Sequence, residues 1–153
     1  MTNRASEVIT RLQGKTLATA ESCTGGGIGQ TLTSVPGASN VYKGGIISYC
    51  NEIKAKMLNV SEELLKIHGA VSAPVAQAMA KGAREALNTD IAVSVTGLAG
   101  PSGDEFGNPV GTVFIGYADK RNLLSSHFLF SGDRNAIRKQ AIEAALELIL
   151  ENA

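Results

Sequence analysis

The sequence predicts one α/β domain over residues 1–153: a three-layer α/β/α sandwich with a mixed, mostly parallel sheet. Three observations predict this fold class. Runs of β-prone residues alternate along the chain with segments of helical apolar spacing. One such run, 91–95, is apolar at nearly every position, which suits a strand covered by helices on both faces. The runs 110–118 and 123–130 are joined by a polar turn, which predicts an antiparallel hairpin.

The first quarter of the chain predicts a helix, a strand, a glycine turn and a second helix. Apolar residues at helical spacing indicate the first helix over 4–13. A short β-prone run follows over 16–20, and a helical pattern resumes over 28–33 after the glycines. A second strand is predicted over 44–50. Strands and helices therefore alternate from the start of the chain.

Three helical segments follow the second strand. Asn51 is a favourable N-cap for a short helix with Ile53 and Met57 on one face. Another helix begins at Ser61, where the acidic residues of the first turn suit the positive end of the macrodipole. Ser72 caps the clearest helix of the chain, which has an apolar stripe and an opposite polar stripe.

The last helix is predicted to begin near Asp133. Its apolar residues share one face, and a charged row lies opposite; the apolar positions are Ile137, Ala141, Ala144 and Leu148. In sheets of this class, ligands bind beyond the carboxyl ends of the strands. Segments 21–27, 49–54 and 96–109 stand at such ends in this prediction. Functional residues are therefore sought there.

Composition narrows the class of protein. Fourteen basic residues balance fourteen acidic ones, so no general basic field is available to bind the phosphates of a nucleic acid. No apolar run reaches the roughly 18 residues of a membrane span, and no export signal is recognised at the N-terminus. Cys23 and Cys50 fit neither a disulfide scaffold nor a metal-knuckle spacing. We expect a cytoplasmic protein that binds neither nucleic acid nor a membrane.

The first candidate for chemistry is the turn at 21–27, Glu-Ser-Cys-Thr-Gly-Gly-Gly. Ser22 would lie beside backbone N–H groups that the glycines leave open to an anion or a developing oxyanion. Thr24, Gly25 and Gly26 are therefore candidate substrate contacts. The turn lacks the lysine of a Walker motif and the last glycine of a dinucleotide fingerprint. The alternative is a tight turn that has only a structural role.

The second candidate is Lys54, which follows Tyr49 closely. If Asn51 is the N-cap, Lys54 occupies the third helical position, where a cation opposes the macrodipole. Apolar neighbours on the same helix would desolvate the amine, and both effects lower a lysine pKa toward that of a general base. Tyr49 adds a hydroxyl able to relay or orient a proton. The alternative is a solvated lysine on a short helix.

Two further candidates are weaker. Thr96 ends the buried strand, and Gly97 and Gly100 belong to a glycine-rich loop that suits backbone contacts to a ligand. The alternative is a flexible crossover loop. Arg134 and Arg138 lie one turn apart on the last helix, a spacing that suits phosphate binding but is more often a solvated surface feature.

The two histidines offer no base. His68 and His127 are isolated in sequence and have no partner at metal-ligand spacing, so no metal and no cofactor are expected. A nucleophilic serine then needs another base, and the serine–lysine variant of acyl-transfer chemistry is the available one. Cys23 is an alternative nucleophile, but it has no activating neighbour in the sequence and is interpreted as a packing residue.

Five motifs in order resemble one family and cover nearly the whole chain. They are Ala-Glu-Ser-Cys-Thr-Gly-Gly at 20–26, Tyr-x-Asn-Glu-x-Lys at 49–54, His-Gly-Ala-Val-Ser at 68–72, Thr-Gly-x-Ala-Gly-Pro at 96–101, and Pro-Val-Gly-Thr-Val at 109–113. Together they resemble the C-terminal domain of the bacterial competence and damage-inducible protein CinA. The resemblance implies an α/β/α fold, no metal, and nicotinamide mononucleotide amidohydrolase activity.

The resemblance also implies roles for individual residues. Ser22 would be the nucleophile, Tyr49 and Lys54 its activating pair, and Thr96 a further hydroxyl of the active site. Arg138 would contact the phosphate or another part of the substrate. Homo-oligomerisation is a further expectation that follows from the resemblance alone.

The sequence therefore leads to one hypothesis and two alternatives. We expect a nicotinamide-nucleotide amidase that hydrolyses nicotinamide mononucleotide to nicotinate mononucleotide and ammonia through Ser22. A catalytically silent nucleotide-binding or interaction module would carry the same motifs. An amidase for another small amide is the second alternative.

Overall fold

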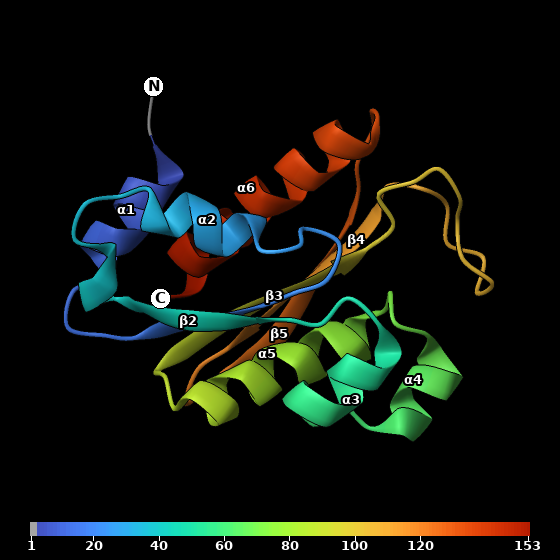
Figure 1. Cartoon of the computed structure of the whole chain (residues 1–153), viewed down its shortest axis with the longest axis horizontal. Coiled ribbons are helices and arrows are strands. Elements are labelled where there is room, and N and C mark those ends of the chain that lie inside the picture. The colour runs from blue at the N-terminus through green and yellow to red at the C-terminus, as the bar shows by residue number, and fades with distance from the viewer. Residues whose placement is uncertain (1–2) are drawn as a thin grey trace.

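Five strands form one sheet at the centre of the molecule, and helices cover both of its faces (Figure 1). The structure is a computed structural model that describes residues 3–153. In chain order the elements are α1 (Arg4–Arg11), β1 (Leu17–Glu21), α2 (Gly27–Thr33), the 3₁₀ helix η1 (Ala38–Asn40), β2 (Tyr42–Ile47), α3 (Asn51–Leu58), α4 (Glu62–His68), α5 (Ala73–Leu87), β3 (Ile91–Gly97), β4 (Thr112–Ala118), β5 (Leu123–Leu129) and α6 (Arg134–Asn152).

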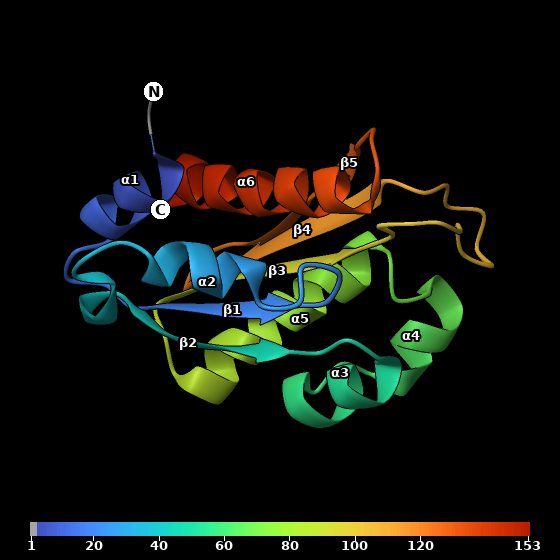
Figure 2. The same cartoon turned by 45° about the horizontal axis from the view of Figure 1, so that its top comes forward.

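The predicted three-layer arrangement is confirmed. Helices α1, α2 and α6 lie on one face of the sheet, and α3, α4 and α5 lie on the other, as the two views show (Figures 1 and 2). The strand order is β2-β1-β3-β4-β5. β1 pairs in parallel with β2 and β3, whereas β3 with β4 and β4 with β5 pair antiparallel. The sheet is therefore mixed. Only β4 runs against the other strands, so most strands share one direction. Half of the strand pairings are parallel and half are antiparallel.

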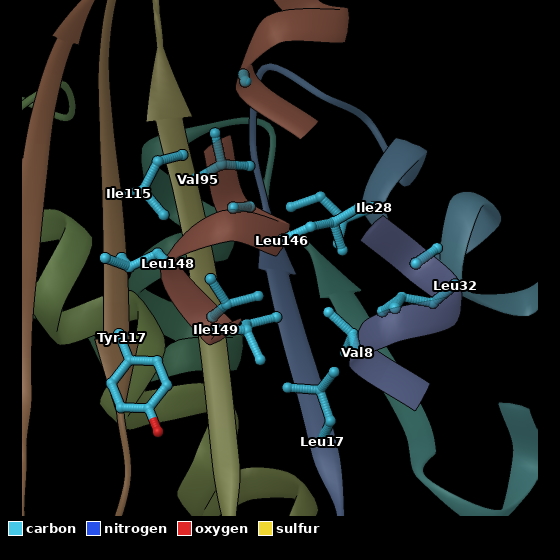
Figure 3. Close-up of a cluster of buried hydrophobic side chains, with 14 of the residues drawn as sticks. Val8, Leu17, Ile28, Leu32, Val95, Ile115, Tyr117, Leu146, Leu148 and Ile149 are labelled. Carbon is cyan, nitrogen blue, oxygen red and sulfur yellow. The ribbon is translucent and has the colours of Figure 1, made fainter. Parts of the chain in front are cut away.

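Two apolar clusters hold the helices on the sheet. The larger cluster lies between the sheet and α1, α2 and α6, and Figure 3 shows part of it. The smaller lies under α5. β3 contributes to both, since Val93 and Val95 point into the first and Ala92 into the second. The prediction that this strand is buried on both faces is confirmed.

The last helix begins where the sequence predicts. Asp133 is its N-cap and accepts a hydrogen bond from the Ala136 N–H at 2.9 Å. The helix lies across the sheet beside α1, and its buried positions include Ile137 and Ala141 as expected. Ala145 is buried in the place predicted for Ala144, which is partly exposed. None of the described helices is both long enough and apolar enough to cross a membrane.

Helix α3 differs from the prediction in its cap and in its buried face. Cys50 is the N-cap and Asn51 the first helical residue. The buried side chains are Lys54 and Leu58, whereas Met57 is half-exposed. The apolar face that Ile53 and Met57 were predicted to share is not the buried face, because the face toward the sheet carries the lysine. Lys54 is therefore the fourth residue of the helix and not the third.

A close approach between α3 and α5 fixes the position of α3. A Cβ atom added at Gly82 of α5 would overlap the carbonyl oxygen of Leu58, the last residue of α3. Only a glycine lets the two backbones come so near.

At the start of α5, Ser72 is the N-cap by position, as predicted. Its hydroxyl accepts no hydrogen bond from the helix N–H groups and instead donates to the Gly69 carbonyl at 2.9 Å.

Candidate active site

The ends of β1, β2 and β3 surround one cavity. These strands are mutually parallel, so their carboxyl ends meet at the same edge of the sheet. A cavity of about 280 Å³ opens there. Its walls come from all three of the segments identified in the sequence, and they include Ser22, Tyr49, Lys54, Thr96, Gly97 and Gly100. The structure thus brings together six of the predicted site residues.

Ser22 directly follows β1 and is held by the backbone on both sides. Its N–H donates to the Val95 carbonyl at 3.0 Å, and its own carbonyl accepts from the Gly25 N–H at 3.0 Å. The hydroxyl lies 3.1 Å from the Lys54 amine. A serine so placed presents its oxygen to the cavity in a fixed position beside a basic group.

The Lys54 side chain returns from α3 toward the strand ends. Helical side chains tilt toward the N-terminus of their helix, which carries this amine back to the segment before α3. There Nζ donates to the Ser48 carbonyl at 2.8 Å and lies within hydrogen-bonding distance of the Ser22 hydroxyl. Lys54 is only 2% exposed. The amine is thus buried against a hydroxyl and a carbonyl. Within residues 3–153 it forms no salt bridge with a carboxylate.

Burial lowers the pKa of Lys54 below its ordinary value of 10.5. Desolvation is the main cause, because it penalises the charged ammonium. The thiol groups of Cys50 and Cys23 act weakly in the other direction. The expectation of a lowered pKa agrees with this direction, although Lys54 stands one residue further into the helix than predicted. A neutral amine can accept the proton of Ser22.

The carboxylate of Glu21 binds the N-terminus of α2, whose free N–H groups were predicted to face a ligand. Its buried carboxylate accepts from the N–H groups of Ile28 at 2.8 Å and Gly29 at 3.0 Å, in the first turn of α2. It also accepts from the Thr24 hydroxyl at 2.6 Å. Thr24 does not line the cavity, and its side chain serves this cap. The carboxylate therefore stabilises the turn from behind.

Sequence reasoning missed this role of Glu21. The available signal was an acidic residue at the end of an apolar strand, just before a helix whose first turn contains no other acid. Of the glycine N–H groups, Gly25 and Gly27 donate within the turn, to the carbonyls of Ser22 and Thr24. Within residues 3–153 the Cys23 N–H has no hydrogen-bond acceptor, and Cys23 lines the cavity. A free donor thus stands directly after Ser22.

Gly25 and Gly26 shape this turn through their backbone. Both have positive φ angles, 59° and 103°, and Gly26 is the N-cap of α2. Neither lines the cavity. The structure thus places these two predicted substrate contacts beside the site, in the turn that positions Ser22.

Tyr49 lies at the rim of the cavity and is 61% exposed. Its hydroxyl accepts a hydrogen bond from the Arg134 guanidinium at 2.9 Å. The same guanidinium donates to the Gly100 carbonyl at 2.5 Å. Among the described residues, no hydrogen bond joins Tyr49 to Ser22 or Lys54, so its role in proton transfer stays a prediction.

The two arginines of the last helix have different positions. Arg134 lines the cavity, whereas Arg138 lies behind the Ser22 turn. Arg138 donates to the carbonyls of Cys23 at 3.0 Å and Thr24 at 3.1 Å. It therefore tethers the turn to α6. Of the pair, Arg134 is the residue whose guanidinium stands at the cavity.

Thr96 and Cys23 also line the cavity. The Thr96 hydroxyl donates to the Ala70 carbonyl at 2.8 Å, which links the end of β3 to the segment before α5. Burial raises the pKa of the Cys23 thiol to about 11, which keeps it protonated near neutral pH and agrees with its interpretation as a packing residue. Over residues 3–153 no three histidine, cysteine or acidic side chains gather at a spacing able to hold a metal ion.

Comparison with known proteins gives consistent results. Residues 2–153 match the family model described as CinA C-terminal domain. The chain is 52% identical over 137 residues to a putative competence-damage inducible protein of Caldicellulosiruptor saccharolyticus, covering 90% of this chain and 33% of that protein. It is 45% identical over 147 residues to a CinA-like protein of Thermotoga maritima, covering 94% and 36%. The chain thus spans about a third of the length of these relatives.

Solved structures share the whole fold. A CinA superfamily protein from Escherichia coli superimposes with a TM-score of 0.96 at 34% identity, covering 99% of this chain and 89% of that one. The competence/damage inducible protein CihA from Agrobacterium tumefaciens gives 0.93 at 38% identity, covering 97% and 92%.

Fold and site together define an α/β/α domain with a buried serine–lysine pair at the carboxyl ends of its parallel strands. The family match and the relatives then make the assignment specific. The chain belongs to the CinA C-terminal domain family.

Replacing Glu21 by Gln tests the carboxylate cap. In the carboxylate, one oxygen accepts from the Ile28 N–H and the other from the Gly29 N–H. The glutamine side chain has a single oxygen, and its NH₂ group cannot accept, so one charge-assisted hydrogen bond is lost. We expect the free energy of unfolding in urea to fall by about 1.5–3 kcal/mol. Glu63→Gln, an exposed acid in α4, is the control and should change it by less than about 1 kcal/mol. Equal effects of the two substitutions would contradict the cap.

The pH dependence of stability tests the burial of Lys54. The folded chain releases this proton at a lower pH than the unfolded chain, whose lysine has a pKa near 10.5. The unfolded state therefore binds more protons between the two values, so stability relative to Lys54→Met rises with pH through that window. Urea unfolding over a pH series measures the difference. The difference in stability between the native chain and Lys56→Met, an exposed position on the same helix, should not change with pH. A pH-independent difference between the native chain and Lys54→Met would contradict the lowered pKa.

Proposed function

We propose that this chain is an amide hydrolase in which Ser22 is the nucleophile and Lys54 the general base, with nicotinamide mononucleotide as the substrate. The observation that carries the proposal is the 3.1 Å contact between the Ser22 hydroxyl and a buried lysine amine whose pKa is lowered. The choice of substrate rests on the resemblance to the CinA C-terminal domain. Membership of that family supports it.

In the first half of the reaction, neutral Lys54 takes the proton of Ser22 as the oxygen attacks the carboxamide carbon. The carbonyl oxygen of the substrate becomes an oxyanion, and the free N–H of Cys23 is the nearest backbone donor along the chain. Protonated Lys54 then gives its proton to the leaving nitrogen, and ammonia departs. An ester of Ser22 with the nicotinate group remains.

In the second half, a water molecule attacks this ester and Lys54 takes one of its protons. The C–O bond to Ser22 breaks, and the proton on Lys54 passes to the serine oxygen. The carboxylic acid that forms releases its remaining proton to water, and the nicotinate product leaves as a carboxylate. The Ser48 carbonyl can hold the amine in place through both halves, because its hydrogen bond to Nζ does not involve the serine hydroxyl. One lysine thus serves as base and acid in turn.

The substrate phosphate is assigned to Arg134. This guanidinium stands at the cavity rim, and its present partners are a neutral hydroxyl and a carbonyl, so no carboxylate competes for its charge. Arginine binds phosphate through paired N–H groups. Tyr49, which shares the rim, would orient that guanidinium and line the path of the substrate.

Loss of either member of the pair should abolish hydrolysis. With nicotinamide mononucleotide as substrate, we expect Ser22→Ala and Lys54→Met each to lower kcat by at least about 10³-fold, measured as ammonia release. The kcat of the native chain should rise with pH and level off below pH 10.5, because Lys54 must lose its proton to act.

Matched controls lie on the surface, with Ser39→Ala and Lys56→Met expected to keep the native rate. Native activity in Ser22→Ala would overturn the mechanism. A native chain that binds the mononucleotide but releases no ammonia would instead indicate a silent binding module. Faster hydrolysis of another small amide would change the substrate and leave the serine–lysine mechanism in place.

Arg134→Gln should weaken binding of the phosphorylated substrate. We expect its KM for nicotinamide mononucleotide to rise by about 10-fold to 100-fold, the equivalent of one charged hydrogen bond, with little change in kcat. The KM for the riboside, which lacks the phosphate, should stay the same. Arg121→Gln, which lies on the far turn between β4 and β5, is the control. An equal rise for both substrates would contradict the phosphate assignment.

A further inference from the structure

Ser48 carries a buried hydroxyl that the proposed chemistry leaves unused. The residue is 0% exposed. Within residues 3–153 its Oγ is the one buried side-chain oxygen or nitrogen that has no hydrogen-bond partner. Such a group is costly, because it has given up its hydrogen bonds to water without replacing them. An unpaired buried hydroxyl therefore calls for an explanation, and a role in catalysis is one.

Strand geometry places this hydroxyl on the face of the sheet that carries α3. The Ser48 N–H donates to the Glu21 carbonyl at 2.8 Å, so the residue continues the pairing of β2 with β1. Side chains alternate along a strand, and Ser48 therefore shares a face with Ile46, which packs in the apolar cluster under α5. α3, which carries Lys54, lies on that face as well (Figures 1 and 2). The hydroxyl and the lysine side chain thus lie on one side of the sheet.

The backbone of the same residue already holds the amine. Lys54 Nζ donates to the Ser48 carbonyl at 2.8 Å and lies 3.1 Å from the Ser22 hydroxyl. The carbonyl oxygen and Oγ of a serine are separated by few bonds, and Oγ moves between staggered positions when the side chain changes rotamer. An amine bound to the carbonyl is therefore within reach of the hydroxyl of the same residue.

The amine needs one more acceptor when it holds a proton. A neutral amine has two N–H donors and a lone pair, which faces the hydroxyl of Ser22, whereas an ammonium has three N–H donors and no lone pair. Ser22 and the Ser48 carbonyl are the hydrogen-bond partners of Nζ within the described chain. A third N–H without an acceptor would destabilise the buried ammonium, because a charged group out of water depends on its hydrogen bonds.

We propose that the Ser48 hydroxyl is a positioning group for the base: when Lys54 takes the proton of Ser22, this hydroxyl turns toward Nζ and accepts the third N–H of the ammonium. The inference rests on the proposed function, because it assigns the hydroxyl to the step in which Lys54 holds the proton. Beside the neutral amine the hydroxyl has no partner, as in the structure. When the proton passes to the leaving nitrogen, the hydroxyl is released again.

This contact tunes the base in the direction opposite to burial. Burial lowers the pKa of Lys54 by penalising the ammonium. A hydrogen bond made only to the ammonium favours that form, so the hydroxyl raises the pKa of Lys54 relative to a chain without it. The amine is then still neutral enough to act as a base, and the ammonium that forms during the reaction is stabilised.

The other titratable groups near the amine leave this effect distinct. Within residues 3–153, those that line the cavity with Lys54 are Cys23, Tyr49 and Arg134, and Cys50 is the N-cap of α3. Burial raises the pKa of Cys23 to about 11, so its thiol stays protonated below that pH. α4 and α5 pack against α3 but contribute no residue to the cavity. All of these groups are unchanged in a chain that lacks only the hydroxyl.

Stability measured against pH tests the contact without any need for catalysis. We expect Ser48→Ala to be at least as stable as the native chain at high pH, where Lys54 is neutral and the hydroxyl has no partner. At low pH the native chain should be favoured by about 10-fold in the equilibrium constant for unfolding, because only its ammonium has a third acceptor. The advantage is lost as pH rises through the pKa of Lys54, which lies below 10.5. Urea unfolding over a pH series measures it.

Ser94→Ala is the matched control. Ser94 is also a fully buried serine, but its hydroxyl donates to the Ala76 carbonyl at 2.5 Å. Its replacement should lower stability by the same amount at every pH. Ser48→Thr keeps a hydroxyl and should keep the native pH dependence. A difference between the native chain and Ser48→Ala that does not change with pH, or that Ser94→Ala reproduces, would overturn the proposal.

The pH profile of hydrolysis separates this inference from the proposed function. With nicotinamide mononucleotide, kcat/KM of Ser48→Ala should reach half of its plateau about one pH unit below the native chain, and the plateau kcat should fall about 10-fold. An unchanged half-plateau pH would overturn the inference and leave the serine–lysine mechanism in place. A chain that hydrolyses no amide, but whose stability difference from Ser48→Ala changes with pH as described, would overturn the proposed function and support the contact between Ser48 and Lys54.

Discussion

The site depends on the burial of one lysine amine beside one serine hydroxyl. Lys54 is buried against Ser22 with only a carbonyl as its other partner, so the fold destabilises the ammonium form and favours the base. This arrangement requires α3 to lie close to the strand ends. The contact of Gly82 with the last residue of α3 makes that possible, because a side chain there would push the helix away. Packing far from the cavity therefore sets the chemistry in it.

The serine turn is held by two opposite charges on the side away from the cavity. Glu21 binds the first N–H groups of α2, and Arg138 binds the carbonyls of Cys23 and Thr24. The carboxylate thus binds the N–H groups at the start of α2, and the guanidinium binds two carbonyls of the turn. With these groups occupied, the free donor of Cys23 stands beside Ser22 at the cavity wall. A rigid turn of this kind suits stabilisation of a charge that forms only during a reaction.

The sequence predicted what depends on local patterns. Apolar periodicity located the helices and strands, the polar turn at 119–122 located the hairpin, and the strand ends located the cavity. Three features escaped it: the inward face of α3, the cap by Glu21, and the different positions of Arg134 and Arg138. Each depends on contacts between segments distant in sequence, such as residues 23 and 138. Helical spacing could place the two arginines on one face, but it could not tell which of them would meet a backbone carbonyl.

The tether between α6 and the serine turn has a consequence for biosynthesis. Ser22 leaves the ribosome before the segments that hold it, because β1 needs β3 as a neighbour and the turn after β1 needs the guanidinium of Arg138 on α6. A nascent chain therefore does not hold the serine turn in place until α6 has emerged and docked. Synthesis truncated before that helix would yield a protein with Ser22 and Lys54 but without the arginine that tethers the serine turn.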